Sequence, residues 1–276
     1  MFNRLSMDTV CASLAYAMGI DAPKYAAAPA ELLVKYVDEK LGGKKADRIV
    51  MYNPDDIGQW VCEKYPALIR EVEENTELAL PLQTVMPSVT PVCFGTMYTG
   101  AQPEVHGIQK YEKPVIKIDS LFDALIRAGK KCAIVSNPQC SLNHIFRERE
   151  MDYYEGVDAD EVNAIAVKLI LEDTYDFLVI YNGNYDFRQH RAGPEGIEAL
   201  AELKCNCRAF HMFANMIEKN WKHHNTLLGF AMDHGSHEIP PLEKDGGTIY
   251  HGSHGDYIPE DINVVHRYRI FPATEG

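Results

Sequence analysis

The chain has 276 residues, of which 46% are hydrophobic and 24% are charged, a balance typical of globular rather than disordered proteins. No apolar run approaches the roughly 20 residues that a membrane-spanning helix needs, so we expect no membrane association. The formal net charge of −13 argues against binding to a nucleic-acid polymer, which requires a basic surface. An anionic phosphate substrate would also be repelled unless bound metal ions supplied positive charge, so part of the acidic excess is expected to bind metal.

Helices and strands are predicted to alternate along the chain. Residues 1–45 are predicted to be helical, mainly over 9–18 and 29–41, and a strand at 48–53 is followed by a helix at about 57–73. Three helix–strand pairs and a last strand follow: helices 119–129, 159–172 and 195–222, and strands 131–136, 176–181, 226–232 and 263–271. This alternation predicts an α/β sandwich with a mostly parallel sheet. No internal repeat or low-complexity linker interrupts it, so we expect one α/β domain over 1–276.

Acidic residues follow three of the predicted strands. Asp55 comes after the first strand, Asp186 lies just past the strand at 176–181, and Asp233 and His234 directly follow the strand at 226–232. In sheets of this kind, ligands bind just beyond the carboxyl ends of the strands. We therefore expect side chains that are distant in the sequence to converge at this edge.

A hydroxyl group is predicted at the start of a helix in the segment 87–108. Thr90 is expected at the N-cap and Pro91 at the first helical position. Free backbone N–H groups and the positive end of the helix dipole at that place suit a phosphate or a developing oxyanion. The alternative is that Thr90 only caps the helix.

Two further segments combine carboxylates with imidazoles. Asp186 and His190 are four residues apart, which places them on one face of a helical turn. Asp233 and His234 adjoin Gly235, which permits a tight turn that can present both side chains to one metal. Oxygen and nitrogen ligands together suit zinc or a similar divalent ion. A lone D-x-x-x-H motif is also common by chance.

The last histidines and the cysteines allow more than one interpretation. His251 and His254 lie in a glycine-rich stretch, 250–259, which is either a metal-binding loop or a flexible surface loop. His237 is another candidate, expected at the surface or behind a ligand. The seven cysteines form no regular framework and predict reduced thiols and a cytoplasmic protein. Cys205 and Cys207 are expected to be helix positions without a metal.

The order and wording of these motifs resemble the alkaline phosphatase superfamily, in particular its type I phosphodiesterase/nucleotide pyrophosphatase and phosphonoacetate hydrolase branch. In that branch a threonine nucleophile lies in a segment ending in T-G-x-x-P-x-x-H-G-I. The matching residues are Thr99-Gly100, Pro103 and His106-Gly107-Ile108, with Thr90 at the nucleophile's distance upstream. The resemblance extends over about 46–271 and leaves out the N-terminal extension. It implies a three-layer α/β/α sandwich, an alkaline-phosphatase-like core without a large cap.

The resemblance also implies a site with two divalent metal ions, zinc first and manganese as the alternative. The implied ligands are Asp186, His190 and His254 for one metal, and Asp55, Thr90, Asp233 and His234 for the other. Asp56 is the alternative to Asp55. Thr90 is the implied nucleophile, which would attack phosphorus and form a phospho-threonine that water then hydrolyses. His106 is implied to be structural, fixing the turn after the helix.

The expected function is a metal-dependent phospho-ester hydrolase that acts on a small phosphorylated substrate. Cys93 stands where the diesterase branch usually has an asparagine, and a thiol is a weaker donor, so the choice between monoester and diester stays open. The sulfatase motif is absent, since Thr90-Pro91-Val92 does not match it. A phosphonate C–P hydrolase, a phosphomutase and a catalytically silent metal-binding protein are the alternatives. Homo-oligomer formation is left open.

Overall fold

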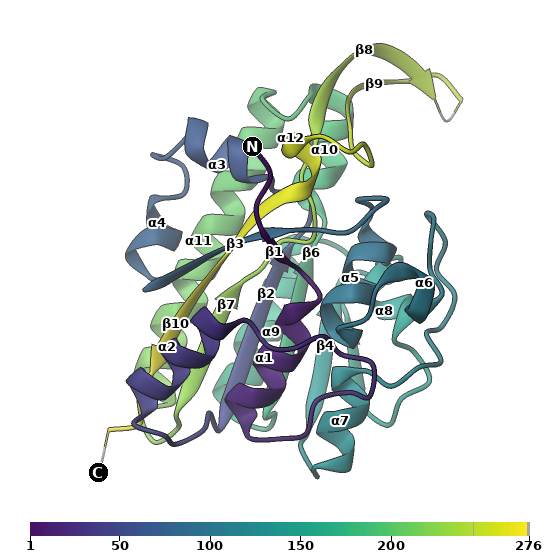
Figure 1. The fold of residues 1–276 in the computed structure, drawn as a ribbon. Coiled ribbons are helices and arrows are strands. Elements are labelled where there is room, and N and C mark those ends of the chain that lie inside the picture. Colours follow the sequence, from purple (N-terminus) through teal and green to yellow (C-terminus); the bar gives the residue numbers. More distant parts are fainter. Residues whose placement is uncertain (245, 275–276) are drawn as a thin grey trace.

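A central eight-stranded sheet organises the fold in the computed structural model, which describes residues 1–244 and 246–274 (Figure 1). Across the sheet the strands are β1 (Leu5–Ser6), β3 (Leu78–Gln83), β10 (Asn263–Phe271), β7 (Thr226–Phe230), β2 (Arg48–Pro54), β6 (Phe177–Asn182), β4 (Cys132–Ser136) and β5 (Asp152–Glu155). Only β10 runs antiparallel to its neighbours, β3 and β7. The predicted mostly parallel sheet is therefore confirmed.

Helices cover both faces of this sheet (Figure 1). One face carries α1 (Thr9–Met18), α2 (Glu31–Leu41), α5 (Thr90–Thr99), α7 (Leu121–Arg127) and α8 (Ser141–Ile145), and the other carries α4 (Arg70–Glu74), α9 (Ala159–Glu172) and α11 (Ile197–Asn220). The other helices are α3 (Gln59–Lys64), α6 (Pro103–His106), α10 (Asn184–Ala192) and α12 (Pro259–Ile262). None of the described helices is long and apolar enough to cross a membrane.

The central strands are apolar because both of their faces are covered. Every residue of β6 and β7 is buried, as is β2 from Ile49 onwards. Such strands form continuous hydrophobic runs, which made them visible in the sequence. Local signals also fixed some helix starts: α9 begins after Asp158, whose carboxylate accepts a hydrogen bond from the Glu161 backbone N–H at 2.9 Å.

Two predictions of local structure are corrected, and some strands were missed. The helix expected over 57–73 is two short helices, α3 and α4, separated by a segment that contains Pro66, which cannot continue a helix. The predicted loop 250–259 contains the end of strand β9 (Thr248–Ser253), which pairs with β8 (His237–Lys244) in a hairpin outside the main sheet. This hairpin and the short strands β1 and β5 escaped prediction because their half-exposed residues show no continuous apolar pattern.

The N-terminal segment is built into the same hydrophobic core. Strand β1 pairs in parallel with β3, and α1 packs against α5 and α7. Met7, Val10 and Leu14 are fully buried in the cluster that also contains the central strands. The segment that the sequence resemblance left out therefore supports α5, the helix that begins at Thr90.

We expect Leu14→Ala to lower the free energy of unfolding by about 2–5 kcal/mol, because it opens a cavity at a fully buried position of α1. Leu32→Ala on α2 is the matched control, since that side chain is 49% exposed, and it should change stability by less than about 1 kcal/mol. Urea unfolding of both variants measures the difference. Equal stability of the two variants would contradict the packing described for α1.

Candidate metal centre

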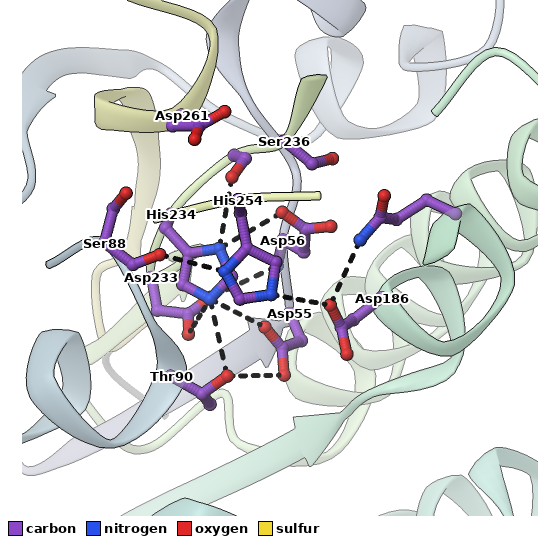
Figure 2. Close-up of polar contacts among 12 residues, drawn as sticks. Asp55, Asp56, Ser88, Thr90, Asp186, Asp233, His234, Ser236, His254 and Asp261 are labelled. Carbon is purple, nitrogen blue, oxygen red and sulfur yellow. Dashed lines mark hydrogen bonds and ion pairs between the residues drawn. The ribbon is translucent and has the colours of Figure 1, made fainter. Parts of the chain in front are cut away.

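The predicted site residues meet at the carboxyl ends of three adjacent strands. Strand β2 lies between β6 and β7 in parallel register, so the residues that follow these strands are neighbours at one edge of the sheet. Asp55 follows β2, Asp233 and His234 follow β7, and Asp186 lies in α10 after β6. Figure 2 shows these side chains facing one another, with Thr90 reaching in from the start of α5.

Asp55, Asp233 and His234 form the first group of candidate ligands. Their ligand atoms lie within 4.8 Å of one another, and all three residues are buried. The Thr90 hydroxyl lies 3.4 Å from Asp55 Oδ2 and 3.4 Å from His234 Nε2 (Figure 2). The structure therefore brings together all four residues that were expected around one metal.

Asp186, His190 and His254 form the second group. One turn of α10 brings His190 Nε2 to 3.2 Å from Asp186 Oδ1, and His254 Nε2 lies 3.4 Å from the same oxygen. His254 follows strand β9, which packs against α10. Its ring stacks on the ring of His234 with 4.2 Å between the centroids, so the two groups adjoin.

All three imidazoles are oriented by a hydrogen bond at Nδ1. His190 Nδ1 lies 3.0 Å from the Gly252 carbonyl oxygen, and His254 Nδ1 lies 3.0 Å from the Ser88 carbonyl oxygen. His234 Nδ1 lies 3.1 Å from Asp56 Oδ1. When Nδ1–H donates to these acceptors, the Nε2 lone pair of each neutral ring faces a carboxylate. This is the tautomer in which imidazole binds a metal.

Buried carboxylate oxygens in this site have no hydrogen-bond donor. Asp55 Oδ1 and Asp233 Oδ2 are both buried without a hydrogen-bond donor, and His234 Nε2 lies 3.5 Å and 3.3 Å from them, respectively. Among residues 1–244 and 246–274, no lysine or arginine forms an ion pair with either carboxylate or with Asp186. An unpaired buried charge is costly, and a bound cation removes that cost. The donor set and the unpartnered oxygens therefore fit divalent metal ions.

The electrostatics of the protein without metal reflect this crowding. Burial, followed by the charges of Asp233 and Asp186, raises the pKa of Asp55, and burial raises the pKa of Asp233 to about 7. Burial opposes a charge on His234, but its hydrogen bond to Asp56 and the surrounding carboxylates outweigh burial and raise its pKa to about 9. Burial alone would raise the pKa of Asp186, but the hydrogen bonds from His190 and His254 lower it well below its usual value. The site compensates its negative charge with protons in the absence of another cation.

The structure separates the positions of Asp55 and Asp56. Asp55 lies in the first group, whereas Asp56 is behind His234 and holds its Nδ1. Asp56 has a positive φ of 66°, and its backbone N–H donates to Asp233 Oδ1 at 3.1 Å. Such an outer carboxylate fixes the ring and makes its free nitrogen more basic. Sequence reasoning proposed Asp56 only as an alternative to Asp55 and missed this place for it.

Tyr181 is a site residue that sequence reasoning missed. It is buried at the end of β6, and its hydroxyl donates a short hydrogen bond to Asp55 Oδ2. This bond occupies one oxygen of the carboxylate and leaves Oδ1 without a partner. Its place at the end of a predicted strand, beside the positions expected to converge, was the available signal.

The surroundings of Thr90 correct one prediction. Helix α5 begins with Thr90 itself, and Val89 is its N-cap, so the expected N-cap position of Thr90 is wrong by one residue. The hydroxyl still lies at the positive end of the helix. Cys93, one turn further on, is fully buried, and its sulfur accepts a hydrogen bond from the Thr84 hydroxyl at 3.0 Å. It faces the protein interior and takes no part in lining the cleft described below.

The other candidate histidines and cysteines lie outside the two groups. His106 contacts the Thr96 hydroxyl through Nε2 at 3.1 Å and packs under Gly95, which fits the structural role implied for it. His237 lies on β8 and contacts Asp261 Oδ1 through Nδ1 at 2.8 Å. His251 belongs to strand β9 rather than to a loop. Cys205 and Cys207 are helix positions in α11, and neither belongs to a metal-ligand group among the described residues.

A cleft of about 1160 Å³ opens onto the metal centre. Asp55, Thr90 and Asp186 line it, so the Thr90 residue and one member of each group of candidate ligands face one space. From there the cleft extends between the segment before α8, the starts of α9 and α10, and one face of α11. Its size suits a small organic ligand.

Comparisons with known proteins agree with this geometry. Residues 51–257 match the sequence model of the family described as type I phosphodiesterase / nucleotide pyrophosphatase. No curated protein matches the chain. Solved structures share its fold: murine ectonucleotide pyrophosphatase/phosphodiesterase 5, an inactive threonine-to-alanine variant in complex with AMP, has a TM-score of 0.61 at 13% identity, over 80% of this chain and 87% of that one.

Two other solved structures show the same fold. Phosphonoacetate hydrolase from Sinorhizobium meliloti, in complex with phosphonoacetate, has a TM-score of 0.53 at 16% identity, over 74% of this chain and 60% of that one. Human ectonucleotide pyrophosphatase/phosphodiesterase 5 has a TM-score of 0.54 at 15% identity, over 70% of this chain and 58% of that one. The family match spans more than half of the chain and includes most of the residues at the candidate metal centre. The chain therefore belongs to the type I phosphodiesterase/nucleotide pyrophosphatase family, within the alkaline phosphatase superfamily.

Proposed function

We propose that this protein is a phospho-ester hydrolase that uses Thr90 as its nucleophile and two divalent metal ions as cofactors. The observation that carries the proposal is the position of the Thr90 hydroxyl. It lies 3.4 Å from both Asp55 Oδ2 and His234 Nε2, beside buried oxygens that have no donor, and it opens onto the cleft. A hydroxyl in this setting is placed to attack a bound phosphoryl group.

The residues of the chain divide the work as follows. The Thr90 hydroxyl donates its hydrogen toward Asp55 Oδ2, which directs a lone pair of its oxygen toward the cleft. Its oxygen forms a bond to phosphorus as the ester oxygen leaves, and water later cleaves the phospho-threonine and restores Thr90. When bound, the metal ions supply positive charge that favours the ionised hydroxyl and stabilises the phosphoryl and leaving oxygens. Tyr181 and Asp56 hold Asp55 and His234 in place.

Asp186, His190 and His254 would hold one metal, and Asp55, Asp233, His234 and Thr90 the other. Carboxylate oxygen and imidazole nitrogen favour zinc, with manganese as the alternative. All seven cysteines are free, and six of them are buried, which supports reduced thiols and a cytoplasmic location in this proposal.

The substrate that we propose is a small phosphorylated molecule. The murine relative that binds AMP is an inactive threonine-to-alanine variant, which supports a central role for a threonine in that protein and, by analogy, for Thr90. Phosphonate hydrolysis is the second candidate, because phosphonoacetate hydrolase has the same fold and Cys93 here points away from the cleft. Neither proposal gives Cys93 a contact with a phosphoryl oxygen.

Thr90→Ala should lower turnover on the order of ten-thousandfold or more, because it removes the atom that attacks phosphorus. Thr90→Ser keeps a hydroxyl and should retain a larger part of the activity. Nitrophenol release from p-nitrophenyl phosphate, bis-p-nitrophenyl phosphate and thymidine monophosphate p-nitrophenyl ester measures this, with zinc and separately with manganese. Turnover of Thr90→Ala at the wild-type rate would remove Thr90 from the nucleophile's role.

Asp186→Ala and His190→Ala should each lose one metal equivalent, because each removes one of three ligands from the second group. His251→Ala is the control, since His251 is on strand β9, three residues before His254, and lies outside both groups. Elemental analysis after purification without chelators, with thermal unfolding alongside, gives the metal content. Two metals retained in both ligand variants would refute the assignment, and less than one metal in the wild type would favour a silent binding protein.

Asp56→Asn should weaken metal binding by about 10–100-fold while the number of sites stays the same, because Asp56 orients the ring of His234 without belonging to the ligand group. Competition with a chromogenic chelator measures the affinity. Asp55→Asn is the comparison and should abolish one site. The same loss of stoichiometry in both variants would show that Asp56, too, binds the metal directly.

A further inference from the structure

The cleft continues beyond the metal centre into a region lined by amide side chains. We call this region the asparagine subsite, and it consists of Asn163, Asn182, Asn184, Glu202 and Asn206. It adjoins the metal centre directly, because the backbone N–H of Asp55 donates to the Asn182 carbonyl oxygen at 2.9 Å. The residues come from α9, the end of β6, α10 and α11, elements that surround one side of the cleft.

A chain of hydrogen bonds leads from Asn163 to the amide of Asn206. Asn182 Nδ2 donates to Asn163 Oδ1 at 2.9 Å and to the Tyr52 hydroxyl at 2.9 Å. The Tyr52 hydroxyl in turn donates to Asn206 Oδ1 at 2.7 Å. Asn206 Nδ2 is then left as a donor without a partner, on a side chain that is only 1% exposed and lines the cleft.

Asn184 shows the opposite arrangement, in which the amide nitrogen is paired and the amide oxygen is not. Its Nδ2 donates to Glu202 Oε2 at 2.7 Å, and its Oδ1 has no partner although it is buried. A flipped amide would point its oxygen at the Glu202 carboxylate, which disfavours that orientation. Glu202 and Asn206 are four residues apart on α11 and therefore share one face of that helix. The subsite thus presents one unpaired donor, Asn206 Nδ2, and one unpaired acceptor, Asn184 Oδ1, in the same cleft.

We propose that the asparagine subsite binds the organic substituent of the phosphoryl substrate through a neutral group that both donates and accepts hydrogen bonds. A hydroxyl group of a polyol or an amide edge of a nucleobase has this chemistry. Either restores the partners of two buried polar atoms, which are costly to leave unpaired. The Glu202 carboxylate beside the acceptor is already paired, since it accepts from Asn184 and lies 3.7 Å from Arg188 Nε. The inference rests on the proposed function, because it assumes that a phosphoryl group occupies the adjoining metal centre.

The test measures binding instead of turnover, so that it is independent of the catalytic proposal. Calorimetry with zinc-saturated Thr90→Ala protein compares three p-nitrophenyl phosphate diesters whose second alcohol is ethanol, glycerol or thymidine. We expect the glyceryl or the thymidine ester to bind about tenfold or more tightly than the ethyl ester. Preference for glycerol would identify a polyol site, and preference for thymidine a nucleobase site.

Asn206→Asp in the same background keeps the acceptor for Tyr52 and removes the unpaired donor, so it should erase the preference for the glyceryl or thymidine ester over the ethyl ester. Asn184→Ala, which removes the acceptor at a half-buried position, should have the same effect and covers the case in which Asn206→Asp does not fold. Asn215→Asp is the matched control, because Asn215 is exposed on the same helix and its amide hydrogen-bonds the His211 ring.

Equal affinity for the three esters, no binding of any of them, or a preference that persists in both subsite variants would overturn the asparagine subsite. Failure of the proposed function has a different signature, which is the absence of turnover by the wild-type protein. If the hydroxylated ester binds tightly and this depends on Asn206, but the wild-type protein hydrolyses no ester, the subsite proposal stands and the hydrolase proposal is refuted. If the wild-type protein hydrolyses all three esters and the Thr90→Ala protein binds them with similar affinity, the hydrolase proposal stands and the asparagine subsite is refuted.

Discussion

Mutual repulsion of clustered carboxylates is the constraint on which this structure depends. Asp55, Asp186 and Asp233 lie at the carboxyl ends of neighbouring strands, with no lysine or arginine of the described residues paired to them. The fold holds them together by burial and backbone register, and it offers imidazole nitrogens as their nearest neighbours. Only an added positive charge makes such an arrangement favourable, whether protons or divalent metal ions supply it. The same charge allows a protein with a net charge of −13 to attract an anionic phosphate.

Hydrogen bonds from residues behind the candidate ligands hold the ligand side chains in fixed orientations. Each of the three imidazoles is held at Nδ1, by Asp56 or by the carbonyl oxygen of Gly252 or Ser88, and Asp55 is held by the Tyr181 hydroxyl. These partners come from loops, a strand and the hairpin, so the site is completed only when distant elements have packed. Metal binding and the packing of the β8–β9 hairpin against α10 are therefore coupled through His254.

The cleft has two parts with different chemistry. The part at Thr90 gathers charged groups that suit a phosphoryl group and metal ions, whereas the part beyond Asn182 includes several asparagine side chains among charged and apolar ones. A substrate with one anionic centre and one hydroxyl- or amide-bearing substituent matches both parts. The membership of the chain in the phosphodiesterase family and its fold neighbours is consistent with such a substrate.

The sequence by itself determined the alternation of helices and strands, because the central strands are covered on both faces and appear as unbroken apolar runs such as 176–181. It also placed Asp55, Asp186, Asp233 and His234 at strand ends, where the parallel topology requires them to converge. Helices without strong terminal signals were predicted less well, as the division of 57–73 into α3 and α4 shows.

Only the tertiary structure showed that Asp55 lies in the candidate ligand group and Asp56 behind His234, since adjacent residues in a turn point in different directions according to their backbone angles, and Asp56 has a positive φ. It also revealed Tyr181 as the donor to Asp55, the inward orientation of Cys93 and the strand position of His251. The unpaired atoms Asn184 Oδ1 and Asn206 Nδ2 could not be predicted either, because whether a polar atom finds a partner depends on residues that are far apart in the sequence. Periodicity records which side of an element is buried, but it does not record which atoms meet there.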